Sequence, residues 1–124
     1  MLTDAPIMAF LATADPMAAR AFYEGTLGLV LREETTFALV FDLGGTELRI
    51  QKVGSFDPQP FTALGWAVAD IEPLVLNLGA AGVAFERYDG LPQDELGIWQ
   101  APGGARIAWF KDPDGNLLSL TEGA

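Results

Sequence analysis

Hydrophobic and polar residues alternate with the spacing of a β-strand in some stretches of this chain and of an α-helix in others. The same order of strand and helix stretches occurs twice. In the first half, Asp15 and Pro16 provide a helix N-cap followed by proline at the first helical position, and Gly25 and Gly28 end that helix. The β-type pattern around it predicts strands at 7–13, 29–33, 36–43 and 46–53. The first half therefore reads as a strand, a helix and three further strands.

The second half repeats this order after a polar, proline-containing linker at 55–60. Asp70 is the expected N-cap of a second helix, Pro73 lies in its first turn and Gly82 ends it. Strands are predicted at 64–69, 83–88, 97–101, 105–111 and 116–120, one strand more than in the first half. Two βαβββ units joined by a short linker predict an α+β fold in a single domain, 1–124, with modules at 6–53 and 61–121.

Helical spacing also predicts which side of each helix is buried. The apolar face of the first helix would contain Ala18, Ala21, Phe22 and Gly25. That of the second would contain Leu74, Leu78 and Ala81.

Composition restricts the chemistry more than the fold. Half of the 124 residues are hydrophobic, the formal net charge is −10, and neither histidine nor cysteine occurs. The missing histidine removes the commonest general base and transition-metal ligand, and the missing cysteine fits a cytoplasmic protein. The negative charge argues against nucleic-acid or membrane partners, and serves either solubility or the attraction of cationic ligands. No secretory or transmembrane segment is expected.

Three stretches carry a family resemblance: "ADPMAARAFYEGTLGL" at 14–29, "GWAVADIEPLVLNLGAAGV" at 65–83 and "WFKDPDGNLLSL" at 109–120. Together they resemble the vicinal oxygen chelate superfamily of glyoxalases, bleomycin-resistance proteins and dioxygenases. The resemblance covers residues 6 to 121. It implies paired βαβββ modules that form a curved mixed sheet around a cleft, usually in a homodimer.

The same resemblance implies where metal-dependent members would hold their metal. The four positions correspond to Met8, Arg49, Leu64 and Ser119 in this chain. None of these residues suits a hard divalent cation, and Arg49 would place a positive charge there. The resemblance is therefore to a metal-free subgroup, and we expect no metal and no cofactor.

Candidate ligand-binding residues follow from alternation along the strands. Arg49 can bind an oxyanion through its planar fork or form a structural ion pair, and Gln51 shares its strand face, whereas Lys52 is expected in solvent. Trp66, on the face of Leu64, could line an apolar cleft, and Trp99 could cover a ligand or an interface. The complete candidate set is Arg49, Gln51, Trp66, Trp99, Phe10, Met8 and Ser119, with core packing as the alternative for Phe10; Trp109 and Phe110 are expected to pack structurally.

Three functions are consistent with these residues. The first is a metal-free protein that binds or sequesters a small organic molecule in the cleft. The second is a metal-independent lyase or isomerase in which Arg49 polarises an oxygen and a carboxylate acts as base. The third, a metal-dependent glyoxalase or dioxygenase, is disfavoured by the missing ligands. The sequence does not decide whether a reaction is catalysed.

Overall fold

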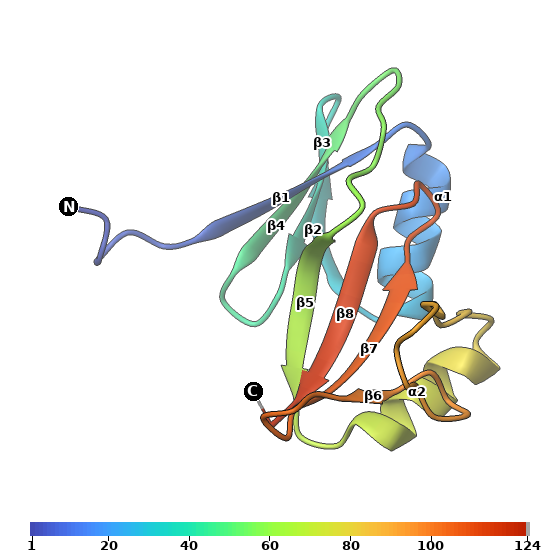
Figure 1. The fold of residues 1–124 in the computed structure, drawn as a ribbon. Helices are drawn as coiled ribbons and strands as arrows, with labels where there is room; N and C mark the ends of the chain where they lie inside the picture. Colours follow the sequence, from blue (N-terminus) through green and yellow to red (C-terminus); the bar gives the residue numbers. More distant parts are fainter. Residues whose placement is uncertain (124) are drawn as a thin grey trace. The chain divides into compact units, whose positions relative to one another are not determined.

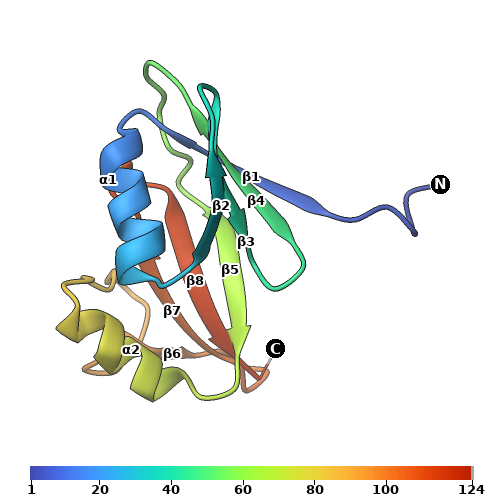
Figure 2. The same ribbon diagram turned by 180° about the vertical axis from the view of Figure 1, so that it is seen from behind.

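The chain divides into two units, each built around one four-stranded sheet. The computed structural model describes residues 1–123; the first unit is Met1–Asp57 and the second begins at Pro58. Figures 1 and 2 show the sheet and the helical segment of each unit from opposite sides. The predicted α+β class is confirmed.

The first unit has its strands in the order β1-β4-β3-β2. β1 and β4 run parallel and the other pairs are antiparallel. Its elements are β1 (Met8–Thr13), α1 (Pro16–Arg20), the π-helical turn η1 (Ala21–Thr26), β2 (Val30–Glu34), β3 (Ala38–Asp42) and β4 (Glu47–Lys52).

The first helix begins as predicted but buries a different side. The Asp15 carboxylate accepts a hydrogen bond from the backbone N–H of Ala18 at 3.2 Å, and Pro16 is the first helical residue. The buried residues are Ala19 and Tyr23, one helical turn apart, and not the predicted face around Ala18. Tyr23 is the larger anchor, with its ring 5.9 Å from that of Phe41 on β3. Burial of this phenol ring determines which side of the helix faces the sheet.

The second unit has the order β5-β8-β7-β6, again with one parallel pair, β5 and β8. Its elements are β5 (Thr62–Val68), α2 (Ile71–Ala80), β6 (Trp99–Gln100), β7 (Arg106–Lys111) and β8 (Leu117–Glu122).

Helix α2 also departs from its predicted face. Ile71 and Val75 are buried, whereas the predicted Leu74 is 37% exposed. The Asp70 side chain makes no capping hydrogen bond, and the N–H of Ile71 instead donates to Glu122 on β8 at 3.0 Å. A bond from the sheet to the first turn thus positions the helix, and it turns Ile71 inward.

The predicted strand at 83–88 was wrong: only an isolated bridge joins Phe85 to Phe110. Side chains make the hydrogen bonds to backbone groups that a neighbouring strand would otherwise make. The Gln93 amide accepts from the N–H of Tyr88 and donates to the carbonyls of Glu86 and Gly97. The segment is therefore a loop tied by its own polar side chains.

The turn at 112–115 between β7 and β8 depends on a buried aspartate. Oδ1 of Asp112 accepts from the N–H groups of Asp114 and Asn116 at 3.0 and 2.9 Å, and Oδ2 accepts from the Asn116 amide at 2.8 Å. Gly115 has φ of +92°, which only glycine adopts readily. This turn sets the register of the β7–β8 hairpin.

Within residues 1–123, no helix has the length and apolar character needed to cross a membrane.

Candidate functional site

The first unit gathers four of the predicted residues on one face of its sheet. Phe10 on β1 lies opposite Arg49 on β4, Met8 lies opposite Glu47 and Ala12 opposite Gln51. Because side chains alternate along a strand, Glu47, Arg49 and Gln51 share one face, and the fully buried Leu48 and Ile50 take the other. We call this surface the Arg49 face; it comprises Met8, Phe10, Glu47, Arg49 and Gln51.

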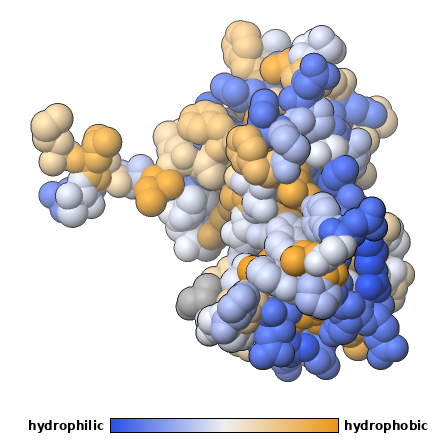
Figure 3. All heavy atoms as spheres, in the orientation of Figure 1, coloured by the Kyte–Doolittle hydropathy of each residue, from blue (hydrophilic) through white to orange (hydrophobic). Residues whose placement is uncertain are grey.

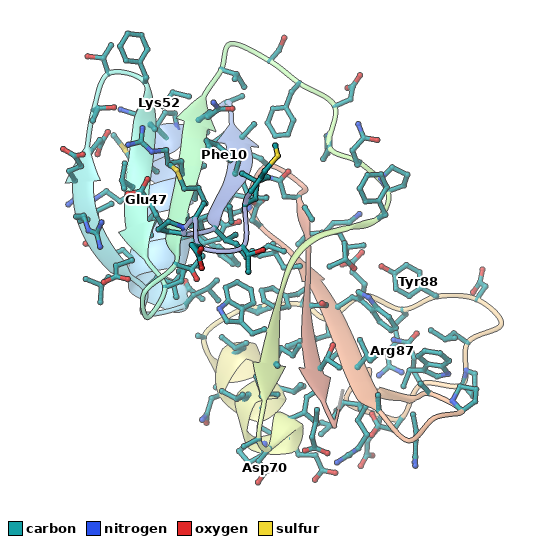
Figure 4. The ribbon with its side chains drawn as sticks, turned by 90° about the vertical axis from the view of Figure 1, so that its left-hand side faces the viewer. Phe10, Glu47, Lys52, Asp70, Arg87 and Tyr88 are labelled. Carbon is teal, nitrogen blue, oxygen red and sulfur yellow. The ribbon has the colours of Figure 1, made fainter. Side chains whose placement is uncertain are left out.

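Apolar and charged groups are both accessible on the Arg49 face. Met8 is 45% and Phe10 53% exposed, so neither side chain is packed in the core. Figure 4 shows the side chains of Phe10 and Glu47 on the strands of this sheet, and Figure 3 shows hydrophobic surface along the N-terminal segment. Exposed apolar side chains next to a guanidinium are the elements of a site for a partly apolar anion.

Arg49 is held at one edge of its guanidinium. Its Nε donates to Oε2 of Glu47 at 2.7 Å, and this bond, with the charges of Glu47 and Glu33, raises the pKa of Arg49 above its ordinary value. Among residues 1–123, Glu47 is the only hydrogen-bond partner of the Arg49 side chain. The terminal nitrogens of the fork thus carry four N–H donors with no protein acceptor.

Glu47, unlike Arg49, has a charged partner at each end of its polar group. One of its oxygens accepts from Arg49, and the other lies 3.5 Å from Arg32, which is also 3.5 Å from Asp42. Both carboxylate oxygens therefore face arginines, and Glu47 orients Arg49 through the shared strand face.

Lys52 was expected in solvent, and this was wrong. Its side chain is only 21% exposed and its ammonium binds Glu34 and the carbonyl of Thr35, each at 2.7 Å. Lys52 shares the buried side of β4 with Ile50, where a charged end must find acceptors. It ties β4 to β2 (Figure 4).

Two of the candidate binding residues, Ser119 and Trp66, do not share a face in the second unit. Ser119 lies opposite Gly65, and Trp66 lies opposite Leu120, so Ser119 and Trp66 occupy opposite faces of the sheet. The Trp66 ring stacks on the buried Phe110, with centroids 6.4 Å apart. Trp66 therefore packs beside the core of the second unit, and it does not share a surface with Ser119.

Ser119 instead shares its face with the predicted Trp99 and with two aromatic residues that were not predicted as site residues, Tyr88 and Trp109. Trp109 lies directly across the β7–β8 ladder from Ser119, and its ring stacks on that of Trp99 with centroids 6.1 Å apart. The ring of Tyr88 meets Trp109 edge to face at 5.5 Å. Counting outward from the turn at 112–115 would have placed Trp109 opposite Ser119. We call this surface the Ser119 face; it comprises Gly65, Ser119, Tyr88, Trp99 and Trp109.

The residue opposite Ser119 is Gly65, whereas the family resemblance gave Leu64 as the site position on this strand. A Cβ atom added at Gly65 would lie 2.5 Å from Oγ of Ser119, so the serine hydroxyl occupies the space above the glycine. Neither residue is a metal ligand of the usual kind. No group of three or more acidic residues among those described is placed to hold a metal ion.

A separate hollow of about 430 Å³ lies between α2 and the loop before β6, lined by residues that include Leu76, Phe85, Arg87 and Leu96. Arg87 donates to the carbonyls of Asp94 and Glu95 at 2.6 Å each, which closes the loop (Figure 4). None of the predicted binding residues lines this hollow.

Comparison with known proteins identifies the family. The family model of the Glyoxalase/Bleomycin resistance protein/Dioxygenase superfamily matches residues 6–120, and the chain belongs to this superfamily. A comparison with curated proteins gives no match.

Solved structures share the fold at low sequence identity. A lactoylglutathione lyase from Agrobacterium tumefaciens is 19% identical with a TM-score of 0.76, over 99% of this chain and 96% of that one. A superfamily member from Sphaerobacter thermophilus is 22% identical with a TM-score of 0.74, over 98% and 99%. A glyoxalase family protein from Enterococcus faecalis is 24% identical with a TM-score of 0.72, over 98% and 100%. These likenesses establish the fold.

Proposed function

We propose that this chain binds a small organic molecule without a catalytic metal, and that Arg49 is the polar anchor for an oxyanion or carbonyl oxygen of the ligand. The observation that carries the proposal is the Arg49 guanidinium, in which Nε alone has a protein acceptor among the described residues. Glu47 holds Nε, and the remaining donors have no protein acceptor within residues 1–123. A planar fork held in this way is oriented in advance for bidentate binding.

Neighbours of Arg49 favour a ligand with an apolar body. Phe10 lies across the ladder from Arg49, Met8 lies two residues before it on the same face, and Gln51 adds an amide beside the fork. A ring or short chain could contact Phe10 and Met8 while its anionic group meets Arg49 and Gln51. In the second unit, Trp99 and Ser119 lie on the Ser119 face of that unit's own sheet, and Trp66 is the weakest candidate because it packs against Phe110.

Binding is favoured over catalysis by the state of the nearest acid. A general base needs an oxygen within reach of the substrate proton. Both oxygens of Glu47 face arginines, so this carboxylate serves to hold Arg49. A metal-independent reaction that uses Arg49 as electrophile would need a base from elsewhere.

A thermal-shift screen of a small-molecule library on wild type and Arg49→Ala tests the proposal. Arg32→Ala is the matched control, since Arg32 is exposed, lies in the same sheet and also contacts Glu47. We expect anionic hits to stabilise wild type and Arg32→Ala but not Arg49→Ala. Hits that stabilise all three proteins equally would show that Arg49 is purely structural.

A further inference from the structure

Three aromatic side chains come together on the second unit, outside the Arg49 face. Trp99 pairs with Ile107, and Trp109 lies two residues further along the same strand face, so the two indoles are neighbours. Tyr88 joins them because the N–H of Glu86 donates to the carbonyl of Trp109 at 2.8 Å, which aligns the loop with β7. Tyr88 is 39% exposed, and both tryptophans are half-buried, so ring surface reaches solvent.

The strands beside this aromatic group carry small side chains. Ser119 and Gly65 lie in one row across the sheet with Trp109, and Thr121 and Ala67 lie in the next row with Ile107. Gly65 and Ala67 are exposed. Small residues therefore form the sheet surface beside the rings, which leaves room for a group of a few atoms against the faces of the indoles.

Charged groups of both signs lie near these rings, and Arg87, the residue before Tyr88, donates to backbone carbonyls of the loop. Glu86 lies 3.5 Å from Lys111, the cation on this part of β7, and both side chains are partly exposed. Burial, and then the negative charge of Glu86, raise the pKa of Tyr88. The chain as a whole has a formal charge of −10, so its field attracts cations.

We propose that the Ser119 face binds an organic cation, a quaternary or methylated ammonium group, against the rings of Trp99, Trp109 and Tyr88. The faces of aromatic rings carry negative potential, which attracts a diffuse cation, and tryptophan is the strongest of them. Methyl groups on the nitrogen would contact the small residues Gly65 and Ser119. A bare metal ion is not the occupant, since it requires several oxygen ligands and this face supplies only the neutral hydroxyls of Ser119 and Tyr88.

This inference rests on the proposed function for one premise, that the open sheet faces bind small molecules. All residues of the Ser119 face belong to the second unit, whereas Arg49 belongs to the first. The two proposals therefore fail separately: loss of anion binding in Arg49→Ala tests the first, and cation selectivity at the tryptophans tests the second.

The test compares choline with its neutral isostere 3,3-dimethylbutan-1-ol, titrated into the full chain at constant ionic strength and followed by tryptophan fluorescence and calorimetry. We expect choline to bind at least about five-fold more tightly than the alcohol, and more weakly as salt rises. Trp109→Leu should weaken choline binding about five-fold or more and leave the alcohol unchanged.

Matched variants keep the test decisive. Trp66→Phe removes an indole from the opposite face of the same sheet and should leave choline binding unchanged. If Trp109→Leu fails to fold, Tyr88→Leu on the loop and Trp99→Leu on the short strand β6 replace it. Equal binding of choline and the alcohol, no binding of choline, or choline binding that survives all three aromatic substitutions would overturn the proposal. Tighter binding of an uncharged aromatic probe such as indole would assign the face to neutral rings instead, and would also overturn it.

Discussion

The contact between Gly65 and Ser119 predicts a coupled pair of substitutions. In Gly65→Ala, the new Cβ would lie 2.5 Å from Oγ of Ser119 and 3.4 Å from its carbonyl oxygen. The first distance is a clash, and the second is van der Waals contact. Ser119 is only 8% exposed, so its hydroxyl has little room to move away.

The size of the effect follows from two opposing terms. Overpacking a well-packed site costs about 1–3 kcal/mol. Replacing glycine by alanine in a backbone that alanine tolerates stabilises by about 0.4–1 kcal/mol, and Gly65 is not among the residues with positive φ. Gly65→Ala alone should therefore lower the free energy of unfolding by about 0.5–2 kcal/mol.

Ser119→Ala removes the clashing atom and reverses the sign. The Cβ of Ser119 would lie 3.8 Å from the new methyl group, which is ordinary contact. In the Ser119→Ala background, Gly65→Ala should raise stability by about 0.4–1 kcal/mol. The double-mutant cycle then gives a coupling of about 1–3 kcal/mol, measured by equilibrium urea unfolding followed by tryptophan fluorescence. A coupling below about 0.5 kcal/mol would refute the register that places Ser119 over Gly65.

Three further predictions concern stability and assembly. The hydrogen bond from Lys52 is the main cause that lowers the pKa of Glu34, so the contribution of Glu34 to stability is present above its unfolded pKa and is lost as the pH falls through its folded pKa. Lys52→Met should reduce this loss of stability at acid pH in thermal melts, and an unchanged pH dependence would refute the pairing. Asp112→Ala leaves two backbone N–H groups without an acceptor and should lower the free energy of unfolding by about 2–4 kcal/mol in urea, whereas Asp112→Asn should cost less than half as much because one oxygen remains. The chain should be a homodimer, because each sheet ends in an edge strand and apolar residues such as Phe10 are exposed; light scattering should give twice the 13.2 kDa of one chain, and the mass of a single chain would contradict this.

The fold and the side of β4 that carries Arg49 could be predicted from the sequence. The β4 segment alternates cleanly between buried and accessible residues, so Arg49 and Gln51 could be assigned to one side from the pattern alone. The repeat of helix caps and glycine stops identified the two units, because these residues have few alternatives at helix ends.

The second face was not predictable in the same way. A one-residue slip moves every side chain of a strand to the other face, and β5 has a register irregularity between Thr62 and Leu64. The resemblance gave Leu64 as the site position on this strand, whereas the structure pairs Gly65 with Ser119. Trp66 was assigned to the face of Leu64, which lies opposite to the face of Ser119. Both helix faces were misjudged for a related reason, since the contacts that set their rotation, Tyr23 with Phe41 and Ile71 with Glu122, join distant parts of the sequence.

The most direct test of metal-independent binding at Arg49 is a calorimetric titration of one anionic screening hit. Wild type and Arg49→Ala are both passed over a chelating resin beforehand, which removes bound metal without adding a competing carboxylate. Wild type should bind after this treatment, and Arg49→Ala should bind at least about ten-fold more weakly, the usual effect of losing a charge-assisted hydrogen bond. Equal dissociation constants for the two proteins, or wild-type binding that returns only when a divalent metal is added back, would contradict the proposed function.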